Sequence, residues 1–464
     1  MQSNFKTPRR RTHVNVGNST RLLLFLAALG AASAQNFSGD ARKIGMGAIG
    51  SSENIATKMI DEQRPYRSIV LPLGFIQAYQ DRDRFDPNDD RFDPILAVEY
   101  AANPIHYVIG RSQSGPGNRF GQDIRNAQFN RDLNAYRGFV PTNTLTAEGL
   151  ASPTWGKTIK FINRSNGTFH GFFLGVGPYI SAKTRWNIDQ ALTAVLSSPT
   201  PVSIPNRSFS IADGTVGQLA LSGTGGYRGR IAFPSRPGAS AEANRDGIYI
   251  GANYHYLRGF RYEAVDMLIR MDTDAAGLLT IRPATTPAVV DYFNSRSGTG
   301  FALDFGVAGV IGGWEFGFGA NGIANRIEWQ NVTGKRFRLA SLVEGGSFIE
   351  SSLGVVNPTL RVELPVDYTG SGAYHTANWS VVTEASHGFQ GNNFRGGIER
   401  RFGRIEFRGG GRYGLNRWHP TGGVGLNLSD KFSVDVGAFG TTTNVERLMR
   451  PGVAVSLRFN AANN

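Results

Sequence analysis

The stretch Phe301-Ala-Leu-Asp-Phe-Gly-Val-Ala-Gly-Val310, followed by Gly312-Gly313 and by Glu315 to Asn321, decides the fold of this chain. Apolar residues at 301, 303, 305 and 307 alternate with small or polar residues, which is the two-residue period of a β-strand whose two faces differ. The glycine pair indicates a tight turn, and the alternation resumes after it. These residues therefore predict a β-hairpin.

The same alternation recurs along most of the chain. One face is apolar and the other is rich in glycine or charge in segments 71–75, 159–161, 248–256, 360–366, 405–413, 424–438 and 453–459. Glycine and charge cannot fill a packed core, whereas the lumen of a membrane barrel tolerates both, and a membrane strand needs about 9–11 residues. A soluble β-sandwich or propeller also alternates and is the competing class. The pattern favours an all-β fold, a transmembrane antiparallel β-barrel.

The first 34 residues have the three parts of an export signal. A basic segment ends at Arg21, an apolar core runs from Leu22 to Leu29, and Ala32-Ser33-Ala34 provides the small residues that a signal peptidase recognises. A membrane-spanning helix needs about 20 apolar residues and is longer than this core. We expect residues 1–34 to be a signal peptide.

The composition excludes several classes of site. The chain of 464 residues has no cysteine, so it has no disulfide, no zinc-thiolate site and no cysteine nucleophile. The formal charge of +13 falls to +8 without the five cations of residues 1–34. This surplus indicates anionic partners only weakly, and we expect no nucleic-acid partner.

Motifs that suggest enzymatic chemistry lack the context that the chemistry needs. Gly45 to Gly50 and Gly317 to Gly322 match Gly-x-Gly-x-x-Gly, but neither follows a buried strand and opens a helix. The seven histidines have no ligand spacing and no Gly-x-Ser-x-Gly elbow occurs, although a dispersed catalytic triad stays open. The aspartates of segment 81–94 offer oxygen atoms to calcium, but arginines neutralise half of them and a solvated loop is the better interpretation. We expect no enzyme, no metal site and no cofactor.

The segment Asp40-Ala-Arg-Lys-Ile-Gly-Met-Gly-Ala-Ile-Gly50, the hairpin after Phe301 and the last strand, Arg450 to Phe459, resemble FadL-like and TraF-like bacterial outer-membrane proteins. The resemblance spans most of the mature chain and rests on short motifs, from which Ile49 and the tail Asn460 to Asn464 depart. It implies a barrel of about 14 strands with an N-terminal hatch segment inside it. It also implies a location in the cell outer membrane of a Gram-negative-type bacterium, with outer-membrane lipid and the barrel-assembly machinery as partners.

The resemblance and the alternation together divide the chain. We expect a hatch or plug segment at residues 35–65, where Gly45, Gly47 and Gly50 allow close backbone packing. The barrel is expected over residues 66–460. Residues 186–206 contain a helix candidate that ends at prolines, and residues 263–299 contain a second irregular or helical insertion. Both are expected to be long loops.

Seven charged residues near the C-terminus are expected to line the lumen: Arg395, Glu399, Arg401, Arg404, Glu406, Arg408 and Arg412. One interpretation is a mixed basic ladder that favours anions. The other is a set of internal ion pairs that anchor the hatch. The pattern does not decide between them.

Two functions follow from these expectations. The first is an outer-membrane channel or passive transporter for hydrophobic or amphipathic small molecules. The basic charge of the protein favours anionic molecules among them. The alternative is a barrel that transports nothing and acts as a secretion or assembly shuttle or docking protein. Residues in the pattern do not identify the ligand.

Overall fold

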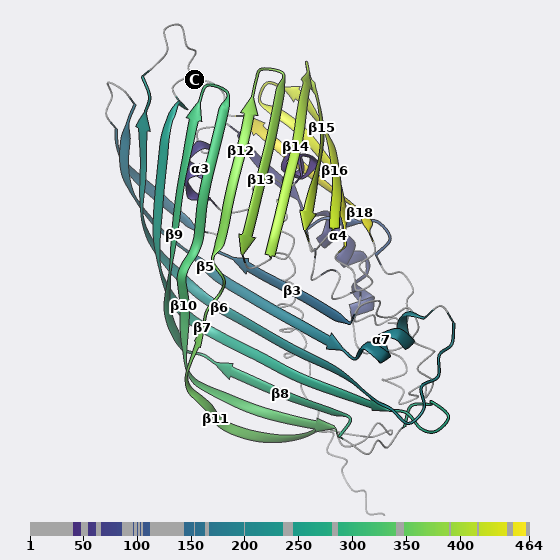
Figure 1. Ribbon diagram of the computed structural model, residues 1–464. Coiled ribbons are helices and arrows are strands. Elements are labelled where there is room, and N and C mark those ends of the chain that lie inside the picture. Colours follow the sequence, from purple (N-terminus) through teal and green to yellow (C-terminus); the bar gives the residue numbers. More distant parts are fainter. Residues whose placement is uncertain are drawn as a thin grey trace, which may run out of the picture.

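The computed structural model describes residues 40–47, 54–61, 66–85, 96, 100, 103, 105–111, 143–152, 154–162, 167–198, 200–234, 245–280, 286–339, 348–388, 391–414, 417–442 and 449–460. These residues form one sheet of 18 strands that curls into a barrel (Figure 1). All of its pairings are antiparallel, which confirms the predicted fold class. The predicted signal peptide, Gly50 and residues 86–94 lie outside the described residues.

The strands follow in chain order as β1 (Tyr66–Leu71), β2 (Tyr107–Val108), β3 (Thr144–Ala151), β4 (Trp155–Ile162), β5 (Phe169–Ile188), β6 (Ser208–Ala232), β7 (Gly247–Asp272), β8 (Ala288–Ser295), β9 (Gly298–Ile311), β10 (Trp314–Leu339), β11 (Phe348–Val362), β12 (Asp367–His375), β13 (Trp379–Gly388), β14 (Gly391–Phe402), β15 (Ile405–Gly414), β16 (Arg417–Ser429), β17 (Phe432–Thr441) and β18 (Arg450–Asn460). The helices are α2 (Ala41–Gly45), α3 (Ile55–Asp61), α4 (Leu73–Gln80), the 3₁₀ turn η1 (Arg82–Phe85) and α7 (Gln190–Ser197).

Four positions of the barrel wall are each built from two strands in line. β1 and β2 pair with successive parts of β18, and β3 and β4 with successive parts of β5. In the same way β8 and β9 share β7, and β11 and β12 share β10. The 18 strands therefore occupy 14 wall positions, as the sequence resemblance implies.

The outer face of the wall carries a band of exposed apolar side chains. It includes Phe172, Leu174, Tyr254, Phe305, Phe316, Phe318, Phe394, Phe407, Trp418 and Val436. Between them the alternate residues point inward, as in β13, where exposed and buried positions alternate from Trp379 to His387. Such a band matches lipid rather than water, which identifies the barrel as transmembrane. Among the described helices, none has both the length and the hydropathy of a membrane-spanning helix.

Half of the wall continues far beyond this band. Strands β13 to β18 have 10 to 13 residues, close to the about 9–11 that a membrane strand needs. Strands β6, β7 and β10 have 25, 26 and 26 residues, more than twice that length. Their far halves form a curved sheet at the end away from the C-terminus (Figure 1). We call this sheet the extension and define it as residues 177–188, 208–221, 258–272, 288–295, 323–339 and 348–362. A strand rises about 3.3 Å per residue along its own axis, so about 15 residues beyond a membrane-length strand add ~50 Å of strand length.

Trp329 joins the extension to the barrel. Its indole is fully buried, and its Nε1 donates a hydrogen bond to Gln218 Oε1 at 2.8 Å. Tyr262 and Leu257 belong to the apolar cluster around it. The ring lies against Gly298, where an added Cβ would come within 2.7 Å of a ring carbon. A side chain at Gly298 would therefore displace the tryptophan.

The structure corrects the predicted loop at residues 263–299. Most of this range is strand, because β7 continues to Asp272 and β8 occupies Ala288–Ser295. A β-bulge leaves Phe260 without a paired residue, and many side chains beyond it are half-buried on both faces. A bulge shifts the alternation to the other face, so the two-residue period is hidden in the sequence. The helix expected within residues 186–206 is α7.

The segment 71–75 is also not one strand. β1 ends at Leu71, and α4 begins at Leu73 after Pro72. Proline has no N–H to donate to the ladder, which explains why the strand ends there. Phe75, Ile76 and Tyr79 of α4 are exposed.

We expect Gly298→Ala to destabilise the barrel by about 1–3 kcal/mol, because the added methyl group overpacks the buried Trp329 ring. Gly309→Ala on the same strand is the matched control, since an added Cβ there meets no atom within 4 Å. The measurement is the temperature at which the folded, fast-migrating band disappears on a denaturing gel. Equal temperatures for the two variants would contradict the role of Trp329.

Candidate functional site

Helix α2 lies inside the barrel against β15 to β18. Asp40 caps the helix by accepting a hydrogen bond from Arg42 N–H at 2.9 Å. Ala41 N–H donates to Ser456 Oγ at 3.2 Å on β18, and Gly47 N–H donates to Thr421 Oγ1 at 2.9 Å on β16. Polar contacts to different strands therefore hold both ends of the segment.

Glycines of the wall allow α2 to approach the backbone of the strands. At Gly437 an added Cβ would lie 2.7 Å from Ala41 O, and at Gly397 it would lie 2.4 Å from Met46 O. Gly47 has a positive φ of 85°, which lets the chain turn away directly after the helix. The excess of glycine in the inward face thus provides a seat for the N-terminal segment.

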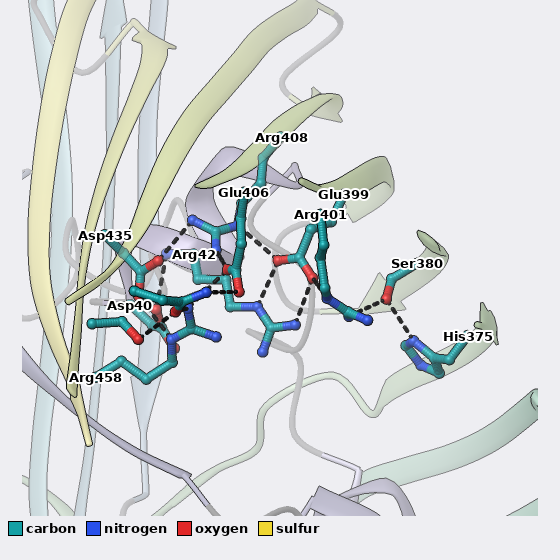
Figure 2. A network of polar contacts seen from close by, with 12 residues as sticks. Asp40, Arg42, His375, Ser380, Glu399, Arg401, Glu406, Arg408, Asp435 and Arg458 are labelled. Atoms are coloured by element: carbon teal, nitrogen blue, oxygen red, sulfur yellow. Dashed lines mark hydrogen bonds and ion pairs between the residues drawn. The ribbon is translucent and has the colours of Figure 1, made fainter. Parts of the chain in front are cut away.

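A buried ion network ties α2 to the wall (Figure 2). Arg42 binds Glu399 with two parallel hydrogen bonds, Nε to Oε2 and Nη2 to Oε1, both at 2.8 Å. Arg408 Nε also donates to Glu399 Oε2 at 2.8 Å, and Arg401 Nη2 donates to Oε1 at 2.8 Å. The side chains of Glu399 and Arg408 are fully buried. One carboxylate on β14 therefore receives one arginine from the helix and two from the wall.

The network continues through Arg408 to β17 and β18. Arg408 Nη1 lies 2.8 Å from Asp435 Oδ1, and Arg408 also contacts Glu406. Arg458 on β18 lies 2.8 Å from Glu406 Oε2 and 3.2 Å from Asp435 Oδ2. A buried charge is very unfavourable without a partner of opposite sign. Because each of the four arginines contacts at least one of the three carboxylates, the geometry supports the anchoring interpretation rather than an open anion ladder.

The predicted lumen residues divide into three groups. Glu399, Arg401, Glu406 and Arg408 belong to the ion network (Figure 2). Arg395 is buried and paired with Glu384, and Arg412 is buried opposite Arg395 in the register of β14 and β15. Arg404 differs from the expectation: it lies in the turn between β14 and β15 and is exposed, because the alternation in sequence runs on through the turn.

Sequence reasoning missed the partners of these residues. Arg42 lies in the segment that carries the family resemblance, and Asp435 and Arg458 occupy inward positions of alternating strands. The signal was a charge at an inward position on each of several strands. Alternation places such charges in the lumen, but only the three-dimensional arrangement pairs them.

Helix α3 occupies another part of the lumen, against β7, β9 and β10. Asn54 precedes it and accepts a hydrogen bond from Ala56 N–H at 2.9 Å. Ile55 lies against Gly251, and Met59 belongs to the same apolar cluster as Tyr249. The attachment of α3 is thus apolar, whereas that of α2 is ionic.

A second polar group crosslinks β6, β7, β9 and β10. His255 Nε2 lies 2.5 Å from Asp304 Oδ2, and His255 Nδ1 lies 3.1 Å from Ser222 Oγ and 2.8 Å from Thr224 Oγ1. Gly322 N–H donates to Asp304 Oδ1 at 2.9 Å. The residue types are those of a hydrolase triad. However, two hydroxyls share one ring nitrogen, and Ser222 and Thr224 are only 1% and 4% exposed, which is the geometry of a tie between strands.

Metal ligands show no comparable arrangement. Within the described part of the chain, no group of three or more His, Cys, Asp or Glu side chains could hold a metal ion.

Comparisons with known proteins leave the family open. No family model matches the chain, and no curated protein matches its sequence. Among solved structures, the Ralstonia pickettii toluene transporter TbuX is similar with 11% identity and a TM-score of 0.31, over 72% of this chain and 93% of that one. The Pseudomonas putida toluene transporter TodX has 10% identity and a TM-score of 0.29, over 72% of this chain and 93% of that one. A mutant of the Rh. blastica porin has 10% identity and a TM-score of 0.20, over 52% of this chain and 98% of that one. Values this low do not establish a shared function.

We expect Glu399→Gln to destabilise the folded barrel by about 3–5 kcal/mol, because it leaves buried arginines without their shared carboxylate. Glu363→Gln is the control, since Glu363 and its partner Arg361 are each about half exposed and such pairs contribute little. Urea unfolding in detergent, followed by tryptophan fluorescence, measures the difference. A midpoint for Glu399→Gln equal to that of Glu363→Gln would contradict the role of the network.

Proposed function

We propose that this protein is an outer-membrane channel or passive transporter for hydrophobic or amphipathic small molecules, with the N-terminal segment as its hatch. The observation that carries the proposal is the position of α2, inside a wall whose outer face is apolar. α2 is held by side-chain contacts and makes no part of the strand ladder. Its displacement would open the lumen without breaking any strand pairing.

The contacts of the two internal helices support an amphipathic substrate. α2 is bound to the wall by the ion pair of Arg42 with Glu399, and α3 by apolar contacts of Ile55 and Met59. Displacement of the hatch would expose polar and apolar surface in the same lumen. The particular ligand is part of the proposal only as this chemical class.

The connections indicate the orientation that we propose in the membrane. Short turns such as Gly312-Gly313 lie at the same end as the C-terminus, and α7, in the connection from β5 to β6, lies at the other end (Figure 1). Outer-membrane barrels have short periplasmic turns and longer external loops. The extension then projects outside the cell. The last strand ends near an exposed Phe459, the feature through which the barrel-assembly machinery is expected to act.

A disulfide lock tests the hatch directly, because the chain has no native cysteine. Ala41→Cys with Ser456→Cys places two thiols where Ala41 N now lies 3.2 Å from Ser456 Oγ. In proteoliposomes we expect oxidation to reduce uptake of a pyrene-labelled fatty acid at least tenfold, and a reductant to restore it. The single Ala41→Cys variant is the control, and its uptake is expected to be the same with and without the oxidant. Full uptake by the locked protein would show that α2 does not move.

The extension favours a second candidate function, a barrel that docks another protein in secretion or assembly. A membrane channel needs no strands more than twice as long as the about 9–11 residues that cross the membrane. Deleting the gene separates the two functions. Lost fatty-acid uptake with normal protein secretion supports transport, whereas mislocalised secreted proteins with normal uptake support docking.

A further inference from the structure

Helix α4 lies at a wall position that strands occupy only in part. β1 and β2 pair with successive parts of β18, and α4 follows β1 directly after Pro72 and contacts β2. It lies close to β18 in Figure 1. This position of the wall is therefore built from a strand, a helix and a second, very short strand.

The side chain of Gln77 on α4 takes the place of a neighbouring strand. Ile109 N–H donates to Pro451 O of β18 at 2.9 Å, so the preceding residue, Val108, turns its backbone groups away from β18. Gln77 Nε2 donates to Val108 O at 3.0 Å, and Gln77 Oε1 accepts from Val108 N–H at 3.2 Å. In lipid no water satisfies such groups, so a free strand edge at this position requires partners from the protein. Gln77 provides them.

The helix lies at the depth of the lipid-facing band. Tyr107, next to Val108, lies opposite Val453 on β18, and Val453 lies opposite Ala438 on β17. Val436 of the band is two residues from Ala438 on the same strand. The edge that Gln77 covers is thus only two strands away from the band, at nearly the same level.

The exposed face of α4 is apolar. Phe75, Ile76 and Tyr79 are 59%, 54% and 69% exposed, whereas Gly74 and Gln77 are buried. At 100° per residue, the three exposed side chains lie on the side of the helix opposite to the two buried residues. This face is therefore turned away from β2.

The chemistry of this face matches the outer side of the wall. On β18 the buried inward positions near α4 are Ala454, Ser456 and Arg458, and the positions between them, Val455 and Leu457, are apolar. Tyr107 and Ile69 lie opposite apolar positions of β18 and are 40% and 55% exposed. An apolar helix face continues this outer surface and differs from the small and polar inner one.

The apolar face ends at charged residues. Arg82 and Asp83 follow in η1, and their side chains are about half exposed. The Arg82 guanidinium lies 4.8 Å from the centre of the Tyr79 ring. Aromatic and basic side chains are typical of the level of the lipid headgroups, where one end of a residue is apolar and the other is wet.

We propose that α4 is a lipid-facing part of the barrel wall, and that acyl chains of membrane lipid pack on Phe75, Ile76 and Tyr79. The helix seals the wall where β1 stops, because Gln77 satisfies the free edge of β2 and the apolar face meets lipid. Tyr79 and Arg82 then lie at the level of the headgroups. The proposal needs only a membrane-spanning barrel and is independent of what the lumen carries.

A nitroxide label at residue 75 tests the lipid contact, because the chain has no native cysteine. Phe75→Cys is labelled and reconstituted into phosphatidylcholine vesicles, and electron paramagnetic resonance measures its collisions with oxygen and with a water-soluble nickel chelate. Oxygen concentrates among acyl chains and the chelate stays in water. We therefore expect the ratio of oxygen to nickel collisions to be several-fold higher at residue 75 than at an aqueous site.

Two labelled variants provide the references. Phe172→Cys lies in the lipid-facing band and is expected to give the same ratio as Phe75→Cys, and Leu278→Cys, in the connection from β7 to β8, is expected to give the aqueous ratio. A heat-modifiable band verifies that each variant forms a barrel. The proposal is overturned if the label at residue 75 gives the aqueous ratio, which would place the face in the lumen or outside the membrane. It is also overturned if neither reagent reaches the label, which would show that protein covers the face.

Gln77→Leu in the Phe75→Cys background tests the seal. The change leaves Val108 N–H and C=O without the amide, so we expect α4 to separate from β2 and nickel collisions at residue 75 to rise several-fold. Gln80→Leu is the matched control, since Gln80 is on the same helix and exposed, and it is expected to leave the collisions unchanged. Equal nickel collisions in the two variants would overturn the role of Gln77 as the partner of the strand edge.

Discussion

The carboxylate of Glu399 is the group on which the arrangement of the lumen depends. It is fully buried on β14 and receives Arg42 from the N-terminal helix together with Arg401 and Arg408 from the wall. Removing one partner of a buried ion pair leaves an uncompensated charge, which is much more unfavourable than losing an exposed pair. The position of α2 and the pairing of the inward charges therefore depend on the same carboxylate. The wall part of the network has three arginines and three carboxylates, and Arg42 of α2 adds a fourth arginine that shares Glu399.

The two internal helices are attached to the wall by different kinds of contact, and this affects how easily each can move. α2 is bound by ion pairs and hydrogen bonds, and α3 by contacts of Ile55 and Met59 with the wall. Ion pairs are specific in geometry, and a charged molecule that enters the lumen competes for them. Apolar contacts have no such competitor. In the proposed transport cycle, α2 is the part that moves and α3 the part that stays.

The barrel and the extension solve different packing problems with the same strands. In the membrane section, apolar side chains face outward and the lumen takes glycine and charge. Beyond it, apolar groups such as Trp329 and Tyr262 pack on the inner face. The bulge at Phe260 lies close to this change. The extra residue of a bulge moves the apolar positions that follow it to the other face of the strand. The extension thereby keeps most apolar surface covered and leaves β11 as its exposed edge.

The residues by themselves determined the fold class, because a two-residue period with glycine and charge on one face has few physical solutions other than a membrane barrel. They also placed Glu399, Glu406 and Arg408 on the inner wall. Only the tertiary structure decided that Arg42, Asp435 and Arg458 complete that network, that Arg404 leaves it, and that residues 263–299 are mostly strand. The reason is that alternation is local, within one strand, whereas ion pairs and bulges depend on residues of other strands, from tens to hundreds of positions away.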